Sequence, residues 1–237
     1  MIAVAAFLAG AAGTALATGA VGPQVSDTER ARIEAVVRDY ILAHPEIIPE
    51  AMQRLQDRQV ATAVSANRAR IETPFAGGWA GNPKGTATLT IFFDYACGYC
   101  RASLPDIERL LKEDKQLKIV FRELPILSDE SELAARASLG AAEQGKFKAF
   151  HDALYAAGRP SAATIAKAQK QTGIDVAASA RTGSSPAAQR EIESNVELAR
   201  LLGFSGTPSW VVGDQVLYGA VGYDALVKAI AKARAGG

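Results

Sequence analysis

The feature that most constrains the fold of this sequence is a pair of cysteines, Cys97 and Cys100, between a predicted strand and a predicted helix. Residues 86–94 are rich in β-branched and aromatic side chains, which is typical of a buried strand. In residues 103–113, apolar side chains recur at helical spacing. The pair therefore falls at a turn from strand to helix, where free backbone N–H groups and the helix dipole favour a thiolate.

No other cysteine occurs in the 237 residues, so the two can form a reactive pair, a structural disulfide or part of a metal site. A disulfide between positions this close closes almost no loop and stabilises little. A zinc site needs four ligands, and the remaining soft side chains are not at ligand-like spacing. These side chains are His44, His151, Met1 and Met52. Two sulfurs suffice for Cu(I), so a copper site at the pair stays open.

The spacing of the pair assigns a role to each cysteine. One helical turn separates Cys97 from Cys100, so Cys100 can reach back to a mixed disulfide formed at Cys97. We predict that Cys97 is the nucleophile and that Cys100 is the resolving thiol.

Composition and charge exclude some other classes of protein. Apolar residues make up 49% of the chain, which supports a packed core. With 26 basic and 25 acidic side chains the net charge is +1. A nucleic-acid-binding protein needs a basic surplus to neutralise phosphates, so we expect no nucleic-acid partner.

The first 26 residues carry one further signal, an Ala-rich apolar stretch without charged side chains. Small residues near positions 15–20 resemble a signal-peptide cleavage site. We expect residues 1–20 to be a signal peptide, with an uncleaved membrane anchor as the alternative. Either segment places the body of the protein outside the cytoplasm, where disulfides persist.

Residues 26–72 are predicted to form two amphipathic helices. The sequence from Ser26 to Glu29 is a capping box, and an apolar face follows it. Residues 73–85 are rich in glycine and proline, which predicts a linker. We expect 26–72 to be a module that packs on copies of itself, with docking on the main domain as the alternative.

Residues 86–237 are predicted to form an α/β domain. A βαβ unit is followed by a helical block over about 128–203, then by two short strands and a final helix. In this domain His151 and Trp210 lie among apolar residues, so we predict core positions for both.

Two motifs resemble those of a known family. The sequences DYACGYC at 94–100 and GTP at 206–208 resemble the signature stretches of DsbA-type thioredoxin-fold disulfide oxidoreductases. The resemblance covers residues 86–237 and implies a thioredoxin fold with an inserted helical domain. It also implies a cis peptide at Thr207-Pro208 that faces the cysteines and contacts the substrate.

Residues 43–50 resemble the N-terminal helical extension of ScsC-type (copper-sensitivity suppressor) proteins. That extension implies a homotrimer in some members. The combined resemblance implies a periplasmic protein without a cofactor. Its partners would be misfolded or cysteine-containing exported proteins and a membrane redox partner that resets the pair.

The sequence departs from the DsbA pattern at two places. The buried acid expected six residues before the first cysteine is replaced by Ile91. The nearest acid is Asp94, three residues before Cys97. We consider Asp94 as a residue that supports the pair, and the alternative is a solvated residue at the end of the strand. Between the cysteines stand Gly98 and Tyr99, as in DsbC-type isomerases. We therefore expect a disulfide isomerase or reductase. The alternatives are a monomeric DsbA-type dithiol oxidase and a Cu(I)-binding copper-tolerance protein.

Overall fold

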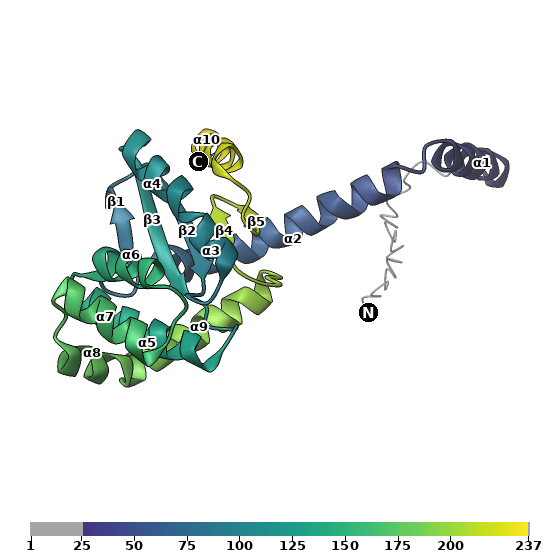
Figure 1. Cartoon of the computed structure of the whole chain (residues 1–237). Coiled ribbons are helices and arrows are strands. Elements are labelled where there is room, and N and C mark those ends of the chain that lie inside the picture. Colours follow the sequence, from purple (N-terminus) through teal and green to yellow (C-terminus); the bar gives the residue numbers. More distant parts are fainter. Residues whose placement is uncertain (1–25, 237) are drawn as a thin grey trace, which may run out of the picture. The chain divides into compact units, whose positions relative to one another are not determined.

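The computed structural model describes residues 26–236, so the predicted signal peptide at 1–20 lies outside the described residues (Figure 1). The chain divides into two compact units, one ending at Met52 and one beginning at Gln53. No helix among residues 26–236 has the length and apolar character needed to cross a membrane.

The N-terminal unit contains α1 (Asp27–Ala43) and the first turns of α2 (Ile47–Glu72). The backbone N–H of Glu29 donates to the Ser26 side chain, so the predicted cap at the start of α1 is present. None of the described side chains of α1 is buried. The helix therefore presents its apolar face to solvent within this unit.

The second unit is built on one mixed sheet in the described part of the chain. Its strands are β1 (Trp79–Gly81), β2 (Ala87–Phe93), β3 (Leu117–Glu123), β4 (Ser209–Val212) and β5 (Gln215–Tyr218). Their order across the sheet is β1-β3-β2-β4-β5. Only β2 and β3 pair in parallel among these strands, and their register places Phe93 beside Glu123. The carboxyl ends of both strands therefore lie at one edge of the sheet.

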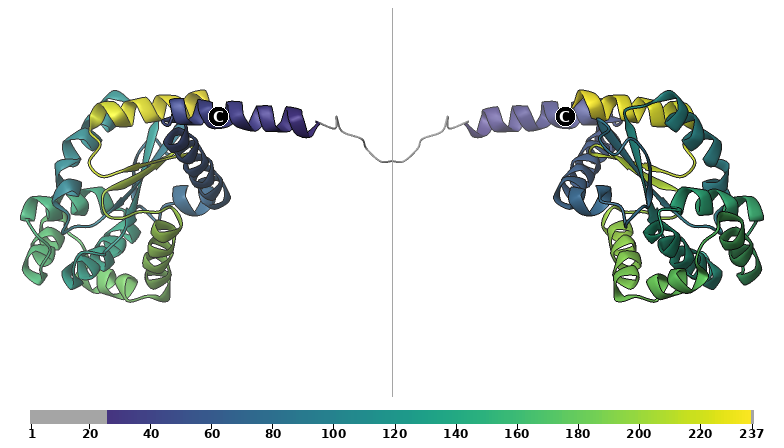
Figure 2. Two further views of the ribbon diagram at one scale, coloured as in Figure 1. Left: turned by 90° about the vertical axis from the view of Figure 1, so that its right-hand side faces the viewer. Right: turned by 90° about the vertical axis from the view of Figure 1, so that its left-hand side faces the viewer.

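Helices connect and cover these strands. They are α3 (Gly98–Ala102), α4 (Leu104–Glu113), α5 (Asp129–Glu143), α6 (Phe147–Ala157), α7 (Ala162–Thr172), α8 (Val176–Gly183), α9 (Pro186–Leu201) and α10 (Tyr223–Ala235). The helices α5 to α9 correspond to the helical insertion expected over 128–203. Figure 2 shows this block and α10 on opposite sides of the unit.

Each face of the sheet has its own apolar core, because side chains alternate along β2. Leu89 and Ile91 pack on one face with apolar residues of α4, α6 and α10. Phe92 packs on the other face with residues of α2 and α9. Trp210 is fully buried in the first core, as predicted.

The segment expected to be a linker, 73–85, differs from that expectation because it contains β1, which pairs with β3. Its glycines serve close backbone approach rather than flexibility. Gly81 has a φ of +89°, and a Cβ there would lie 2.4 Å from the Leu117 carbonyl oxygen. A glycine-rich composition is typical both of a flexible linker and of a segment whose backbone packs closely on its neighbours, so the sequence pattern did not distinguish the two.

The boundary expected at residue 72 also differs from the structure, because the second half of α2 belongs to the sheet-containing unit. Val64 and Ile71 are buried in the core beneath Phe92. The Ile71 carbonyl oxygen accepts hydrogen bonds from the Thr90 hydroxyl and the Arg122 guanidinium. The apolar pattern of α2 is sparse after residue 55, which is why the sequence did not reveal this contact.

Candidate active site

The turn from β2 to α3 positions the nucleophile candidate. The backbone N–H of Cys97 donates to the Asp94 carbonyl oxygen over 3.0 Å, which closes the turn. Cys97 caps the start of α3, where its Sγ accepts a hydrogen bond from the Cys100 backbone N–H over 3.1 Å. The two cysteines thus lie side by side at the beginning of the helix, as the spacing predicted.

The loop before β4 lies opposite this turn. The Thr207–Pro208 peptide is cis, as expected. The Cys97 thiol donates to the Thr207 carbonyl oxygen over 3.1 Å. The Thr207 hydroxyl is buried and has no hydrogen-bond partner within residues 26–236. Tertiary folding therefore brings the two signature stretches into direct contact.

The two thiols have opposite pKa shifts. A hydrogen bond with the Cys100 side chain lowers the pKa of Cys97 from 9.0 to about 6, against the effect of burial. The Thr207 side chain and the backbone of Cys100 and Tyr99 contribute to the lowered pKa. Burial, followed by the neighbouring Cys97, raises the pKa of Cys100 far above its usual range. At neutral pH the pair therefore holds one thiolate, at Cys97.

The residues between the cysteines face solvent. Tyr99 is 70% exposed, and a Cβ at Gly98 would meet no atom within 4 Å. The lowered pKa of Cys97 thus arises without a histidine between the cysteines. These two positions are open to an approaching polypeptide.

Asp94 is buried, so the alternative role as a solvated strand end is wrong. Its carboxylate accepts hydrogen bonds from the Ala96 backbone N–H over 2.7 Å and the Ser131 hydroxyl over 2.6 Å. It also accepts from the backbone N–H groups of Ile126 and Leu127, over 2.9 and 3.0 Å. Asp94 therefore ties the loop after β3 to the turn that holds Cys97.

A buried polar cluster lies behind the turn. The Tyr95 hydroxyl is hydrogen-bonded to Ser138 over 2.9 Å and to His151 Nδ1 over 3.2 Å. The Tyr155 hydroxyl donates to the Asp94 carbonyl oxygen over 2.9 Å. Burial lowers the pKa of His151 to about 3, so this imidazole is neutral. The predicted core role of His151 is confirmed.

Sequence reasoning missed Glu123, the last residue of β3. It is 2% exposed, and burial raises its pKa well above the usual 4.5. The only sequence signal for it was a charged residue at the end of a buried strand, just before Leu124-Pro125. Such a residue is more often solvated at the strand end, so the pattern did not single it out.

The described residues contain no group of three or more His, Cys, Asp or Glu side chains arranged to hold a metal ion. The two sulfurs of Cys97 and Cys100 are the atoms that a soft metal such as Cu(I) would bind.

A family model described as a DSBA-like thioredoxin domain matches residues 88–231, which is more than half of the chain. The chain belongs to the DSBA-like thioredoxin family. A second model, the N-terminal domain of the copper resistance protein ScsC, matches residues 29–61. The DsbA-like fold with an N-terminal helical extension, expected from the sequence, is therefore confirmed.

Solved structures with the same fold include family relatives from several bacteria. The chain is 37% identical to a thioredoxin-like oxidoreductase from Silicibacter pomeroyi, with a TM-score of 0.68, covering 71% of this chain and 98% of that one. It is 26% identical to the catalytic domain of Proteus mirabilis ScsC, with a TM-score of 0.66, covering 74% and 98%. It is 28% identical to the thiol-disulfide exchange protein α-DsbA2 from Wolbachia pipientis, with a TM-score of 0.68, covering 75% and 97%.

Among curated proteins, the DSBA-like chain matches two Na⁺/H⁺ antiporters named NhaA, from Salinispora tropica and Salinispora arenicola. Identity is 28% in both, over 62% and 63% of this chain. The chain spans about a quarter of the length of these relatives, because each alignment covers 23% of the antiporter.

Proposed function

We propose that this protein exchanges disulfides with cysteine-containing exported polypeptides as an isomerase or reductase. The observation that carries the proposal is the unequal pair of thiols: Cys97 is a thiolate near neutral pH, whereas Cys100 keeps its proton. A nucleophile poised beside a protonated resolving thiol is what thiol–disulfide exchange requires. Residues Thr207 and Pro208 line the side of Cys97 from which a client strand would approach.

The exchange runs in two bond-forming steps. The Cys97 thiolate attacks one sulfur of a client disulfide, forming a mixed disulfide and releasing the other client sulfur as a thiolate. In reduction, Cys100 gives up its proton and attacks the Cys97 sulfur, so that the Cys97–Cys100 disulfide forms while the bond from Cys97 to the client breaks. The second client sulfur leaves as a thiolate that can take up the proton, so the pair is oxidised and the client has received two electrons. In isomerisation, a client thiolate attacks the mixed disulfide instead and the Cys97 thiolate is regenerated. A membrane redox partner then reduces the Cys97–Cys100 disulfide that forms in this way.

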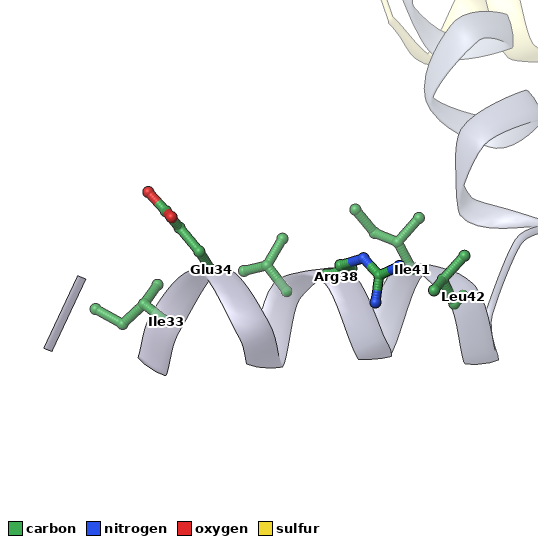
Figure 3. A pocket seen from close by; sticks show the side chains of 6 residues that line it. Ile33, Glu34, Arg38, Ile41 and Leu42 are labelled. Atoms are coloured by element: carbon green, nitrogen blue, oxygen red, sulfur yellow. The ribbon is translucent and has the colours of Figure 1, made fainter. Parts of the chain in front are cut away.

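We also propose that residues 26–52 join copies of the chain into a homo-oligomer, in line with the trimer expected for an ScsC-like extension. Figure 3 shows Ile33, Ile41 and Leu42 on α1, together with the charged Glu34 and Arg38. The exposed apolar side chains of this unit further include Val36, Val37, Tyr40, Ile48 and Met52. Apolar helical faces of this size are stable in water only when they are covered. A second copy with the same face supplies that cover, and the flanking opposite charges suit self-pairing.

An exported location, with residues 1–20 as a signal peptide, belongs to the same proposal. A disulfide-exchange protein acts where disulfides form and persist, which in bacteria is the periplasm.

Refolding of a scrambled-disulfide client tests the function. The full mature chain should restore client activity, Cys97→Ser should abolish the effect, and Cys100→Ser should accumulate mixed disulfides. If the protein oxidises reduced clients but fails to rescue scrambled ones, the monomeric oxidase alternative replaces the isomerase. Light scattering on the same samples measures the mass, and a monomeric mass would contradict the assembly.

Binding of Cu(I) is a second candidate function, favoured by the two sulfurs held on one short turn and by the match to a copper resistance domain. Titration of the reduced chain with Cu(I), beside Cys100→Ser, tests it. Binding that is equally tight in the variant would contradict a two-sulfur site.

A further inference from the structure

Glu123 is a buried acid that the exchange reaction described above does not use. Its Oε1 atom has no hydrogen-bond partner within residues 26–236, although the side chain is almost completely buried. Its backbone carbonyl oxygen accepts from the Asn195 side chain over 3.0 Å. An unpaired carboxyl oxygen in a core costs free energy, so a retained one indicates a role beyond packing.

The register of the sheet places this acid close to the dithiol. Glu123 lies beside Phe93 on the neighbouring parallel strand, and the turn from Asp94 to Cys97 begins at the next residue. Neighbouring strands are about 4.8 Å apart and such a turn spans less than about 7 Å, so Glu123 and Cys97 are separated by a distance on the order of 10 Å. The position occupied by Ile91 is one step further along the same face.

Tyr155 is a common neighbour of the acid and the thiols. Its hydroxyl donates to the Asp94 carbonyl oxygen, to which the Cys97 backbone N–H also donates. Burial raises the pKa of Tyr155, and electrostatic interactions with Cys100, Tyr95, Glu123 and Cys97 add to the shift. The acid and the dithiol therefore belong to one buried electrostatic environment.

That environment contains little positive charge. The titratable and charged groups from the elements around Glu123 include Asp94, Tyr95, His151, Tyr155, Glu191 and Arg122. The ion pair of Lys148 and Asp152 on α6 acts on the same cluster through His151 and Tyr95. Arg122 is paired with Glu191, and His151 is neutral. Burial and the charges of Asp94 and Glu191 favour the neutral form of Glu123, while Ser138 opposes them through a hydrogen bond.

We propose that Glu123 takes up a proton when the Cys97–Cys100 pair is reduced and releases it when the pair is oxidised. The inference rests on the proposed thiol–disulfide exchange. In the reduced protein the negative charge is on Cys97, and Glu123 is neutral. When the disulfide forms between Cys97 and Cys100, two electrons pass to the client disulfide and the thiolate charge is lost. Glu123 then ionises more readily and passes its proton to solvent. Reduction reverses each of these steps.

Glu123 touches no reacting atom, so it tunes the pair through its charge. Two unit charges about 10 Å apart, at an effective dielectric constant of about 20, shift each other's titration by about one pKa unit. By linkage, the redox equilibrium of the pair changes by the same factor when Glu123 ionises. At low pH Glu123 is neutral in both redox states, so it does not change the redox equilibrium of the cysteine pair.

The test is the equilibrium constant with glutathione, measured as a function of pH on the full chain. We expect the wild type and Glu123→Gln to agree at acid pH. The wild type should then become harder to reduce with rising pH, until the two constants differ about tenfold. Glu143→Gln, the same change at an exposed position on the helix that carries Ser138, should follow the wild type throughout.

Parallel curves for the wild type and Glu123→Gln, with normal exchange activity, would overturn this inference alone. A wild type without exchange activity would overturn the proposed function instead. If Glu123→Gln does not fold, infrared difference spectra of the wild type decide the question. Loss of a protonated-carboxyl carbonyl band on oxidation supports the proposal, and an unchanged carboxyl region contradicts it.

Discussion

The Cys97 thiol donates a hydrogen bond to the Thr207 carbonyl oxygen over 3.1 Å, although 110 positions separate these residues in the sequence. The contact joins the strand-to-helix turn to the loop before β4. It also places the Thr207 side chain near the sulfur, where this side chain lowers the pKa of Cys97.

Replacing Thr207 by valine should raise the pKa of Cys97 by up to about one unit, because the variant keeps the shape but loses the hydroxyl. The ultraviolet absorbance of the thiolate, followed against pH in the reduced protein, measures this value. Thr182→Val, a change in a helix of the insertion, is the matched control. An unshifted titration in Thr207→Val would show that the hydroxyl does not act on the sulfur.

The reactivity of the reduced protein should depend on pH with a midpoint at about 6, the pKa of Cys97. The stability of the reduced protein should follow the same group. Its folded pKa lies below the reference value of 9.0, so folding is favoured most above pH 9.0 and the contribution is lost as pH falls through about 6. Urea unfolding of the reduced protein at several pH values measures it. Cys97→Ser should not show this rise in stability.

At Glu123 we expect stability to depend on pH in the opposite direction, because burial raises the pKa of this group in the folded protein. Below its usual pKa of 4.5 the group is neutral in both states and makes no pH-dependent contribution to stability. As pH rises above that value, ionisation favours the unfolded chain and the wild type loses stability. Glu123→Gln should therefore gain stability relative to the wild type with rising pH in urea unfolding. A difference that is constant over pH would contradict a raised pKa.

Asp94→Ala should lower the free energy of unfolding by about 3 kcal/mol, because four hydrogen-bond donors lose their acceptor. Denaturant unfolding of the oxidised protein measures the loss. Glu143→Ala, at an exposed position, serves as the control and should change the stability by less than about 0.5 kcal/mol. A small effect of Asp94→Ala would mean that the loop after β3 does not depend on this carboxylate.

Ile71→Ala should lower the free energy of unfolding of the sheet-containing unit by about 3 kcal/mol, because Ile71 is fully buried at the end of α2. Gln56→Ala, at an exposed position on the same helix, should have little effect. Near-ultraviolet circular dichroism in urea, which reports on the buried Trp210, measures both. Equal stabilities would place the boundary between the units after α2 instead of within it.

Several features of the site could be predicted from local sequence because they depend on spacing along one segment. The strand before Cys97, the helix after it and the distance of one helical turn to Cys100 are such features. The second motif, at Thr207 and Pro208, was predicted through its family resemblance, and its contact with Cys97 followed from the implied fold.

The roles of acidic residues were less predictable. Asp94 and Glu123 are each a single acidic residue near the end of an apolar strand, and nothing in the local sequence pattern distinguishes a solvated residue from a buried one. The helix–loop packing that removes both from water is made by residues of α5, α6 and α9, far away in the sequence.

The sequence by itself determined the dithiol, its place at a helix start, the DsbA-like order of elements and the apolar face of α1. Periodicity and spacing are local properties, so they can be recognised in the sequence without knowledge of the fold. Only the tertiary structure decided that α2 continues into the sheet-containing unit, that 73–85 contributes a strand, and that a buried acid on β3 lies near the thiols. Burial is the physical reason, since it depends on which distant segments cover a side chain, and it raises the pKa of Cys100 and of Glu123.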